Sequence, residues 1–210
     1  KTLLKRFSKI GIGANVPFDE NSIDPETKKI MQEAIDEAMV KIEEETKNLG
    51  IVKDGWMQVS GAFGSPKAME GKFLTRAAAA YFGLYGNDLE EAFYPDTTID
   101  ENGDALDGSK QNYILHFSKD RLPPVKAFWS FSMYKMTEKL FTENSINRYV
   151  ISSATDGLQY NKDGSLDIYI QKEKPSTDKV SNWLPAYDGK FSLQARLYWP
   201  EPESLDPLYV

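Results

Sequence analysis

Residues 191–199 read Phe191-Ser192-Leu193-Gln194-Ala195-Arg196-Leu197-Tyr198-Trp199, so apolar side chains occupy every odd-numbered position. Because successive side chains of a strand point to opposite faces, this run predicts a β-strand that buries its odd-numbered residues, Trp199 included. Residues 129–134 and 166–171 alternate in the same way. Asn-Gly and Asp-Gly turn pairs separate such runs, which together predict an antiparallel sandwich or barrel in the second half of the chain.

The chain before residue 87 has a mainly helical pattern instead. Asp24-Pro25-Glu26 favours a helix start, because Asp caps an N-terminus and Pro suits the first helical position. Apolar residues then recur at helical spacing as far as Leu49, which predicts a helix over residues 25–49. The run 73–82 contains four consecutive alanines and predicts a second helix, with a strand near residues 56–60 between the two.

Composition excludes several classes of protein and of site. A formal net charge of -7 argues against binding nucleic acid by neutralising its phosphates. No run approaches the roughly 18 apolar residues of a membrane-spanning helix. The lack of Cys excludes disulfides, thiolate metal sites and Cys nucleophiles, and the single histidine, His116, excludes a two-His or three-His metal site within one chain. Common phosphate-binding and serine-hydrolase motifs are also absent, and we expect neither a metal nor a cofactor.

The second half of the chain resembles the domain of unknown function 1214 in motifs that follow one another in the family's order. These motifs are Tyr113-Ile114-Leu115-His116-Phe117, Leu122-Pro123-Pro124-Val125-Lys126-Ala127-Phe128-Trp129-Ser130, Asn147-Arg148-Tyr149, Gly157-Leu158-Gln159-Tyr160-Asn161-Lys162-Asp163-Gly164-Ser165-Leu166, Ser181-Asn182-Trp183-Leu184-Pro185-Ala186 and Arg196-Leu197-Tyr198-Trp199-Pro200. The resemblance covers nearly everything from residue 88 to residue 207. The earlier stretch, with Gly55-Trp56 and Leu74-Thr75-Arg76-Ala77, is similar to what precedes this domain in proteins that also carry the domain of unknown function 1254.

This resemblance implies a jelly-roll-like β domain beside a helical segment, as the C-terminal part of a larger bacterial protein that is often periplasmic or secreted. It implies no established reaction. We therefore predict an α+β fold, with a mainly helical segment over residues 1–86 packed on an antiparallel jelly-roll-like β-sandwich over residues 87–210. One departure concerns Ser153-Ala154-Thr155-Asp156-Gly157-Leu158, where family members often read Asp-Arg-Thr-Pro-Gly-Leu. Any role of that Asp-Arg pair is in doubt here.

The polar faces of the expected strands contain the first candidate binding residues. They are Tyr134 with Ser130 and Ser132, Tyr169 with Asp167 and Gln171, and Arg196 with Tyr198. If these strands share a sheet, their polar faces form an aromatic, hydrogen-bonding surface for a polar organic ligand such as a sugar or a small acid. The alternative, which we favour, is a solvated outer face of the sandwich, where alternating Tyr and charged residues are normal.

Arg148, Asp156 and Trp183 are further candidates, and each also has a structural explanation. The Arg148 guanidinium could clamp an anionic ligand, or it could bond to loop carbonyl groups or pair with Asp156. Trp183 precedes Leu184-Pro185 in an expected loop. It could form a platform for a sugar ring, or it could cover the hydrophobic core.

His116 and an acidic loop are weighed in the same way. His116 could serve as a general base, but a packed and hydrogen-bonded histidine is the interpretation we favour. The loop of Asp100, Asn102, Asp104 and Asp107 has oxygen atoms suited to calcium. It has Gln111 where a calcium-binding loop has its last Glu, so we interpret it as a solvated hairpin loop.

These observations lead to three hypotheses for function. The first is a binding or accessory protein, the β domain of a larger exported protein, that holds a polar small molecule, a glycan or a partner. The second is a hydrolase or lyase for carbohydrate or ester substrates, with carboxylates and tyrosines as catalytic groups and Arg148 as anion stabiliser. The third is a structural module that forms homo-oligomers or packs on an absent N-terminal domain.

Overall fold

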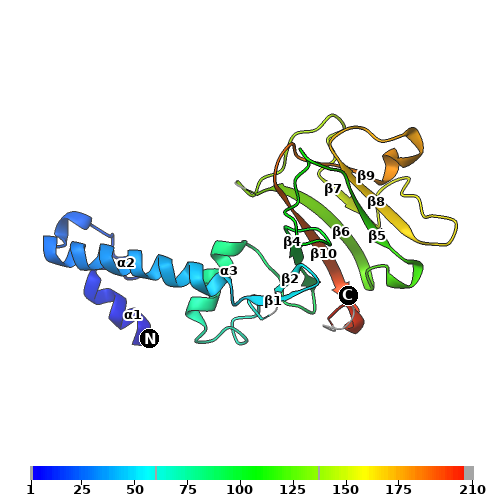
Figure 1. The fold of residues 1–210 in the computed structure, drawn as a ribbon. Helices are drawn as coiled ribbons and strands as arrows, with labels where there is room; N and C mark the ends of the chain where they lie inside the picture. The colour runs from blue at the N-terminus through cyan, green and yellow to red at the C-terminus, as the bar shows by residue number, and fades with distance from the viewer. Residues whose placement is uncertain (1, 60, 137, 206–210) are drawn as a thin grey trace.

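The computed structural model describes residues 2–59, 61–136 and 138–205. Within them, the α-helices are α1 (Thr2–Phe7), α2 (Pro25–Thr46) and α3 (Phe73–Phe82), and the 3-10 helices are η1 (Ser8–Ile10), η2 (Glu20–Ser22), η3 (Lys119–Arg121), η4 (Thr177–Asn182) and η5 (Pro202–Leu205). The strands are β1 (Gly50–Lys53), β2 (Trp56–Val59), β3 (Ala92–Phe93), β4 (Pro95–Thr97), β5 (Tyr113–Phe117), β6 (Val125–Lys135), β7 (Val150–Ser152), β8 (Leu166–Gln171), β9 (Trp183–Pro185) and β10 (Phe191–Pro200). Helices and sheets occupy separate parts of the molecule (Figure 1), so the predicted α+β class is confirmed.

Helix α2 begins where the sequence predicts and ends three residues earlier. The Asp24 carboxylate accepts a hydrogen bond from the Thr27 backbone N–H at 2.9 Å, and Pro25 occupies the first turn. The helix ends at Thr46, because the chain turns over residues 47–49 to enter β1. Its C-terminal end packs on α3, and the rest of α2 extends with α1 away from the two sheets (Figure 1).

Strand β10 pairs with three strands of the larger sheet, whose order is β1-β2-β4-β10-β6-β7 with β3 also paired to β10. The alternation predicted for residues 191–199 is confirmed from Phe191 to Leu197, where odd-numbered side chains are buried. The prediction for Trp199 is wrong, since its side chain is 60% exposed. The pairing of β10 with β6 shifts register between Tyr198 and Pro200, and Trp199 has a φ of 51°. Such a β-bulge re-aims the side chain toward solvent.

The smaller sheet has the order β5-β8-β9 and shares one hydrophobic core with the larger sheet. Leu166, Ile168 and Ile170 of β8 are buried, as their alternation predicts, in the same cluster as Phe131 and Leu193 of the larger sheet. β5 and β8 are antiparallel, but β8 and β9 run parallel and are joined through η4. This sheet is therefore mixed, where the sequence predicts antiparallel pairing alone.

Strands β1 and β2 belong to the first 86 residues and form a hairpin that extends the larger sheet beyond β4. This agrees with the strand predicted near residues 56–60, of which Ser60 lies outside the described residues. The domain boundary between residues 86 and 87 stays a prediction. One face of the larger sheet packs on the smaller sheet, and the opposite face carries the even-numbered side chains of β10.

Candidate functional site

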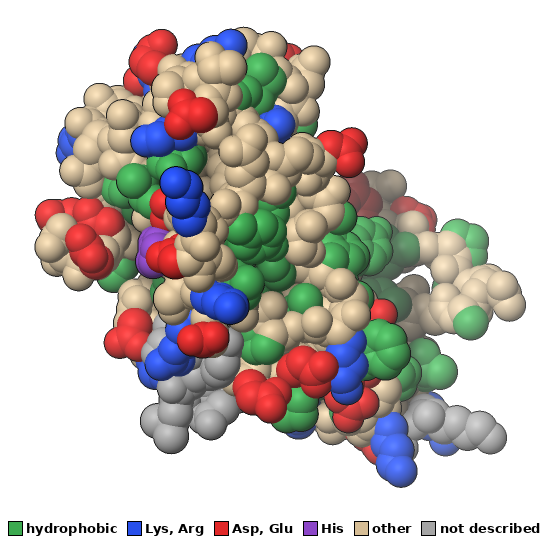
Figure 2. Space-filling view, turned by 90° about the vertical axis from the view of Figure 1, so that its right-hand side faces the viewer, with side chains coloured by type: hydrophobic (Ala, Val, Ile, Leu, Met, Phe, Trp, Pro, Cys, Tyr) green, Lys and Arg blue, Asp and Glu red, His purple; other side chains and the backbone are tan. Residues whose placement is uncertain are grey.

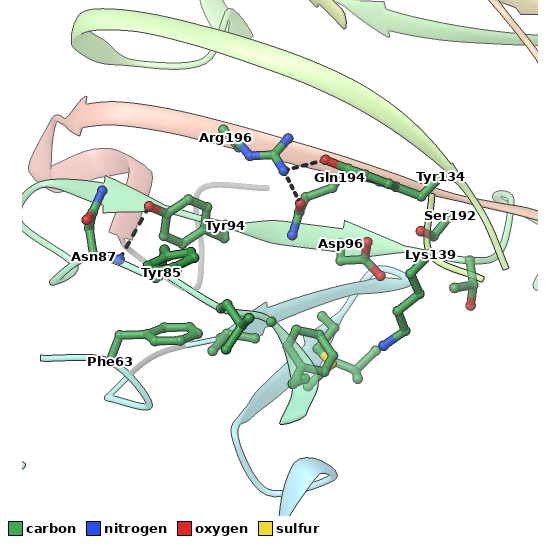
Figure 3. Close-up of a pocket in the computed structure, with 18 of the residues that line it drawn as sticks. Phe63, Tyr85, Asn87, Tyr94, Asp96, Tyr134, Lys139, Ser192, Gln194 and Arg196 are labelled. Carbon is green, nitrogen blue, oxygen red and sulfur yellow. Dashed lines mark hydrogen bonds between the residues drawn. The ribbon is translucent and has the colours of Figure 1, made fainter. Parts of the chain in front are cut away.

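A pocket of about 710 Å³ opens on the face of the larger sheet that points away from the shared core (Figure 3). Side chains of β4, β6 and β10 form its polar floor, and β1, β2, residues 82–87, Met136 and Lys139 form its walls. A volume of several hundred cubic ångströms is typical of sites for small organic ligands. The pocket therefore combines segments that lie far apart in the sequence.

Arg196 is the cation of the pocket floor, and it is held by three neutral side chains. Its Nη1 donates to Ser132 Oγ at 2.9 Å, while its Nη2 donates to Tyr134 Oη at 2.7 Å and to Gln194 Oε1 at 2.6 Å. The guanidinium carbon also lies 5.7 Å from the centre of the Tyr134 ring. Among the described residues, no carboxylate lies within ion-pairing distance of Arg196. The guanidinium is thus fixed in place without being neutralised.

Asp96 lies beside this network, on strand β4. The register places Asp96 opposite Gln194 of β10 on one side and opposite Met57 of β2 on the other. Burial raises the pKa of the Asp96 carboxyl to about 6, although the charge of Lys139, a hydrogen bond with Ser192 and the charge of Arg196 act in the opposite direction. Figure 3 shows Gln194 between Arg196 and Asp96, so the pocket floor carries a cation and an acid with an amide side chain between them.

Aromatic side chains cover the other side of the pocket. The ring of Tyr94 meets that of Phe63 edge to face, with 6.5 Å between centroids, and its hydroxyl accepts the Asn87 backbone N–H at 3.4 Å. Burial raises the pKa of Tyr94, whose hydroxyl is protonated at neutral pH even without this shift. Lys139 Nζ lies 5.0 Å from the centre of the Phe82 ring. The walls can therefore hold an apolar body as well as polar groups.

The rim of the pocket includes the short segment Gly83-Leu84-Tyr85-Gly86. Tyr85 has a φ of 62° and is 95% exposed, an unusual state for a large aromatic residue. Gly86 packs so closely on Phe63 that a Cβ atom there would lie 2.4 Å from the ring, whereas a Cβ at Gly83 would meet open space. The Gly86 contact fixes the position of the Phe63 wall.

The structure brings together three of the seven ligand-binding candidates that the sequence suggests. Tyr134, Arg196 and Tyr198 all line the pocket. The polar face that they form with Ser130 and Ser132 is covered, since Ser130 is 5% and Ser132 is 1% exposed. The favoured prediction of a solvated outer face is therefore wrong for this part of the larger sheet.

The other four candidates lie outside the pocket lining. Arg148 Nη1 donates to the backbone carbonyl oxygens of Val180, Ser181 and Trp183 at 2.7, 3.1 and 2.9 Å, which is the structural role that the sequence left open. Trp183 is 1% exposed, and its Nε1 donates to the Gln171 carbonyl at 2.8 Å. Its ring lies in the interior and offers no platform for a sugar.

Tyr169 and Asp156 are likewise apart from the pocket and from each other. Tyr169 lies on β8 of the smaller sheet, where Lys179 Nζ is 4.7 Å from the centre of its ring. The condition that the three polar strand faces share one sheet is thus not met, since β8 belongs to a different sheet from β6 and β10. Asp156 is exposed in a turn closed by the Leu158 N–H and the Thr155 carbonyl, and none of the described ion pairs joins it to Arg148.

His116 is hydrogen-bonded as predicted, but it is not packed in the interior. Its Nδ1 lies 2.6 Å from Asp167 Oδ1, and 56% of its side chain is exposed (purple in Figure 2). The two residues face each other across β5 and β8. The hydrogen bond with His116 is the main cause that lowers the pKa of Asp167, to which Asn161 Nδ2 also donates at 3.0 Å.

The functional residues that sequence reasoning missed include Asp96, Gln194 and Lys139. Gln194 lies two positions before Arg196 on the same polar face of β10, so the alternation of polar and apolar residues in this strand pointed to it. Asp96 lies in a three-residue strand with no periodicity, and Lys139 lies outside the strands. No sequence signal pointed to either residue.

The described ranges contain neither a metal-binding cluster nor a helix suited to cross a membrane. No cluster there of three or more His, Cys, Asp or Glu side chains is arranged to hold a metal ion. The Asp100 carboxylate instead accepts the Asn102 and Asp104 backbone N–H groups at 2.9 and 3.0 Å, as in a hairpin loop. Of the described helices, none has the length and apolar character needed to cross a bilayer.

Comparison with protein families matches residues 91–202 to the family described as protein of unknown function DUF1214. The chain belongs to the DUF1214 family. The DUF1214 region contains β4, β6 and β10, which supply the pocket floor with Arg196 and Asp96. The walls from β1, β2 and residues 82–87 precede it. The pocket therefore spans the DUF1214 region and the segment before it.

A solved structure with a similar fold supports the architecture of this DUF1214 protein. The VPA0106 protein from Vibrio parahaemolyticus matches with a TM-score of 0.66 at 24% identity, over 95% of this chain and 46% of that one. This chain thus spans about half the length of that protein. A putative uncharacterized protein from Burkholderia cenocepacia aligns with a TM-score of 0.37 at 14% identity, over 66% of this chain and 42% of that one. A search of curated proteins gave no match.

Proposed function

We propose that this chain binds a small organic molecule with polar groups in the pocket between the larger sheet and residues 82–87. The observation that carries the proposal is the Arg196 guanidinium, held by Ser132, Tyr134 and Gln194 at the pocket floor. Its three partners orient the group and leave its charge unpaired. A ligand that brings hydrogen-bond acceptors completes this arrangement.

The same geometry favours binding over the hydrolase or lyase alternative. Most glycoside hydrolases need two carboxyl groups about 5 to 10 Å apart. Among the described residues that line the pocket, Asp96 is the one carboxylate. Arg148, which that alternative uses as anion stabiliser, is engaged by three backbone carbonyl groups outside the pocket. Binding therefore needs no residue that the site lacks.

A thermal-shift screen tests this proposal with sugars, small carboxylic acids, amino acids and neutral amides. A ligand present at a hundred times its dissociation constant stabilises the folded state by about 2.7 kcal/mol, which corresponds to roughly 5–10 °C for a protein of this size. Arg196→Gln should abolish the shift. Arg6→Gln, on the exposed surface of α1, should leave it unchanged. A shift that survives in Arg196→Gln would place the site elsewhere, and no shift with any class would contradict the proposal.

A second candidate function, assembly, has its own observation in helix α2. None of its side chains is buried, and Ile30, Ile35 and Met39 of its apolar stripe are 58%, 53% and 38% exposed. Helices gain most of their stability from packing an apolar face, so this surface favours a partner, either a second copy or a preceding domain. Sedimentation of the parent and of Ile35→Asp tests self-association. A monomer at every concentration would leave the preceding domain as the partner of α2.

Two finer predictions remain proposals that rest on the family. Two sheets around one core favour a jelly-roll-like β-sandwich, and the parallel pairing of β8 with β9 is a departure from it. The place of the chain in a larger protein is favoured by the length of the VPA0106 protein, of which this chain covers 46%, whereas export rests on the family resemblance alone. Fractionation of cells that express the natural full-length protein tests export, and recovery in the cytoplasm alone would contradict it.

A further inference from the structure

We propose that the ligand of this pocket is an amphipathic monocarboxylate, an organic acid whose carboxylate binds Arg196 and whose apolar body packs on the walls around Phe63 and Met57. This inference rests on the proposed binding function and narrows it to one chemical class. It follows from the charge of the pocket, from the partners of Arg196 and from the distribution of polar and apolar residues over the lining.

The first argument is the hydrogen bonding of Arg196. A guanidinium has five N–H donors in a planar fork that matches a carboxylate. Three of these donors bind neutral oxygen atoms, and none binds an anion among the described residues. The side chain is half-buried, so water screens its charge only in part. A ligand carboxylate gives the strongest partner that such a group can find.

The second argument is the net charge of the lining. Arg196 and Lys139 carry two positive charges, and Asp96 carries one negative charge when ionised. The other described lining residues are neutral, which leaves a net charge of +1. A monoanion neutralises this charge, whereas a dianion would bring a second negative charge toward Asp96. A neutral sugar would leave Arg196 without a counter-charge.

The third argument is the segregation of the lining. The lining side chains on the floor strands β4, β6 and β10 are all polar, whereas the walls carry fewer polar side chains, among them Asn87, Tyr94 and Lys139. Apolar side chains gather on the walls, and they are Val52, Met57, Val59, Phe63, Phe82, Leu84, Ile99 and Met136. Figure 3 shows Phe63 across the pocket from Arg196 and Gln194. With about 710 Å³ of space, the pocket exceeds the needs of a two-carbon acid and fits a body of six or more carbons.

Asp96 makes the binding of an anion depend on pH. The charged groups that act on Asp96 are Arg196 of β10 and Lys139 after β6. The other titratable side chains of the pocket lining are Tyr85, Tyr94, Tyr134 and Tyr198, and the lining residues from β1 and β2 are not titratable. Burial raises the pKa of Asp96 to about 6, so the group loses its charge as the pH falls through that value. The repulsion of a ligand carboxylate then disappears. Affinity for a monocarboxylate should rise about threefold or more between about pH 7.5 and pH 5.5.

The test is calorimetric titration of the parent chain with 3-phenylpropionate and with linear monocarboxylates of six to twelve carbons, each beside its own neutral amide. We expect at least one acid to bind about tenfold more tightly than its amide, since the charge-assisted bond to Arg196 is absent from the amide. Arg196→Gln should remove this preference, and Arg6→Gln should keep it. Asp96→Asn should remove the pH dependence and keep the preference for the acid.

The outcomes separate this inference from the function on which it rests. If an amide or a sugar binds and no acid binds more tightly than its amide, the monocarboxylate assignment is wrong while the binding function stands. If no acid, amide or sugar binds, both are wrong. The comparison of acid with amide is made on the parent chain, so it tests the monocarboxylate assignment even if Arg196→Gln fails to fold. A preference for the acid that persists in a folded Arg196→Gln variant would also overturn the assignment.

Discussion

Replacing Arg148 with Met tests whether this residue has a structural role or acts as an anion clamp. Arg148→Met keeps the apolar stem of the side chain and removes the guanidinium. In the structure, Nη1 donates to three backbone carbonyl oxygens at 2.7, 2.9 and 3.1 Å. Because Nη1 carries two N–H groups, two full hydrogen bonds are lost, each with a charged donor and a contribution of about 1.5–3 kcal/mol. The side chain is half-buried, so water replaces part of the lost hydrogen bonding, and we expect a loss of about 2–3 kcal/mol in the free energy of unfolding.

Urea denaturation followed by tryptophan fluorescence measures this loss directly, and thermal unfolding should show a decrease in Tm of about 4–12 °C. Arg6→Met, at an exposed position of α1, is the matched control and should change stability by less than about 0.5 kcal/mol. Ligand affinity should be unchanged in Arg148→Met, because Arg148 does not line the pocket. A variant with the stability of the parent and without ligand binding would refute this reasoning and restore the anion clamp.

Three further predictions concern stability. Asp96→Asn should be more stable than the parent at pH 7, and the difference should vanish below about pH 4. Burial raises the pKa of Asp96 from 3.8 to about 6, so the folded parent binds this proton more tightly than the unfolded chain does. The parent therefore loses up to about 3 kcal/mol of its free energy of unfolding as the pH rises from about 4 to about 7. A stability difference between Asp96→Asn and the parent that does not change with pH in urea titrations would contradict this prediction. Gly86→Ala should destabilise the fold by about 1–3 kcal/mol and weaken ligand binding, because the added Cβ would displace the Phe63 ring. Gly83→Ala, whose Cβ meets open space, should do neither. Equal effects of the two substitutions would count against the contact between Gly86 and Phe63. Asn182→Ala should destabilise the fold by about 2–4 kcal/mol, because the buried side-chain amide forms hydrogen bonds with the backbone of Gln159 and with the Asp167 carbonyl. A change below about 1 kcal/mol in a urea titration would show that water replaces these hydrogen bonds.

Local rules predicted the longest strands, β6, β8 and β10, and the two longest helices, α2 and α3. The alternation in residues 166–171 gave both the bounds and the buried face of β8, because a strand with one buried face must alternate. The capping pattern at Asp24 gave the start of α2. Trp199 was misplaced, since a bulge depends on the register of a neighbouring strand, and that register is not a local property. The parallel pairing of β8 with β9 likewise depends on the path of a connection through η4.

The candidate site was predictable only where one strand supplied several of its residues. Arg196, Tyr198 and Gln194 share a face of β10 because they are two positions apart, and the sequence shows this spacing. Asp96, Phe63 and residues 82–87 reach the same pocket through long-range packing, which no local pattern encodes. The partners of Arg148 and the burial of Trp183 depend in the same way on how η4 and the start of β9 pack on the rest of the chain.

The most direct test of a ligand site around Arg196 is NMR mapping of backbone amide signals during titration with the tightest-binding monocarboxylate. The largest shifts should come from β4, from residues 132–135 of β6 and Met136 after it, from residues 192–198 of β10 and from residues 83–87, which together surround the pocket. Residues 148–160 and 177–185, which hold Arg148 and Trp183, should change little. Shifts centred on those two segments, or an unchanged spectrum at saturating ligand, would contradict the assignment of the pocket.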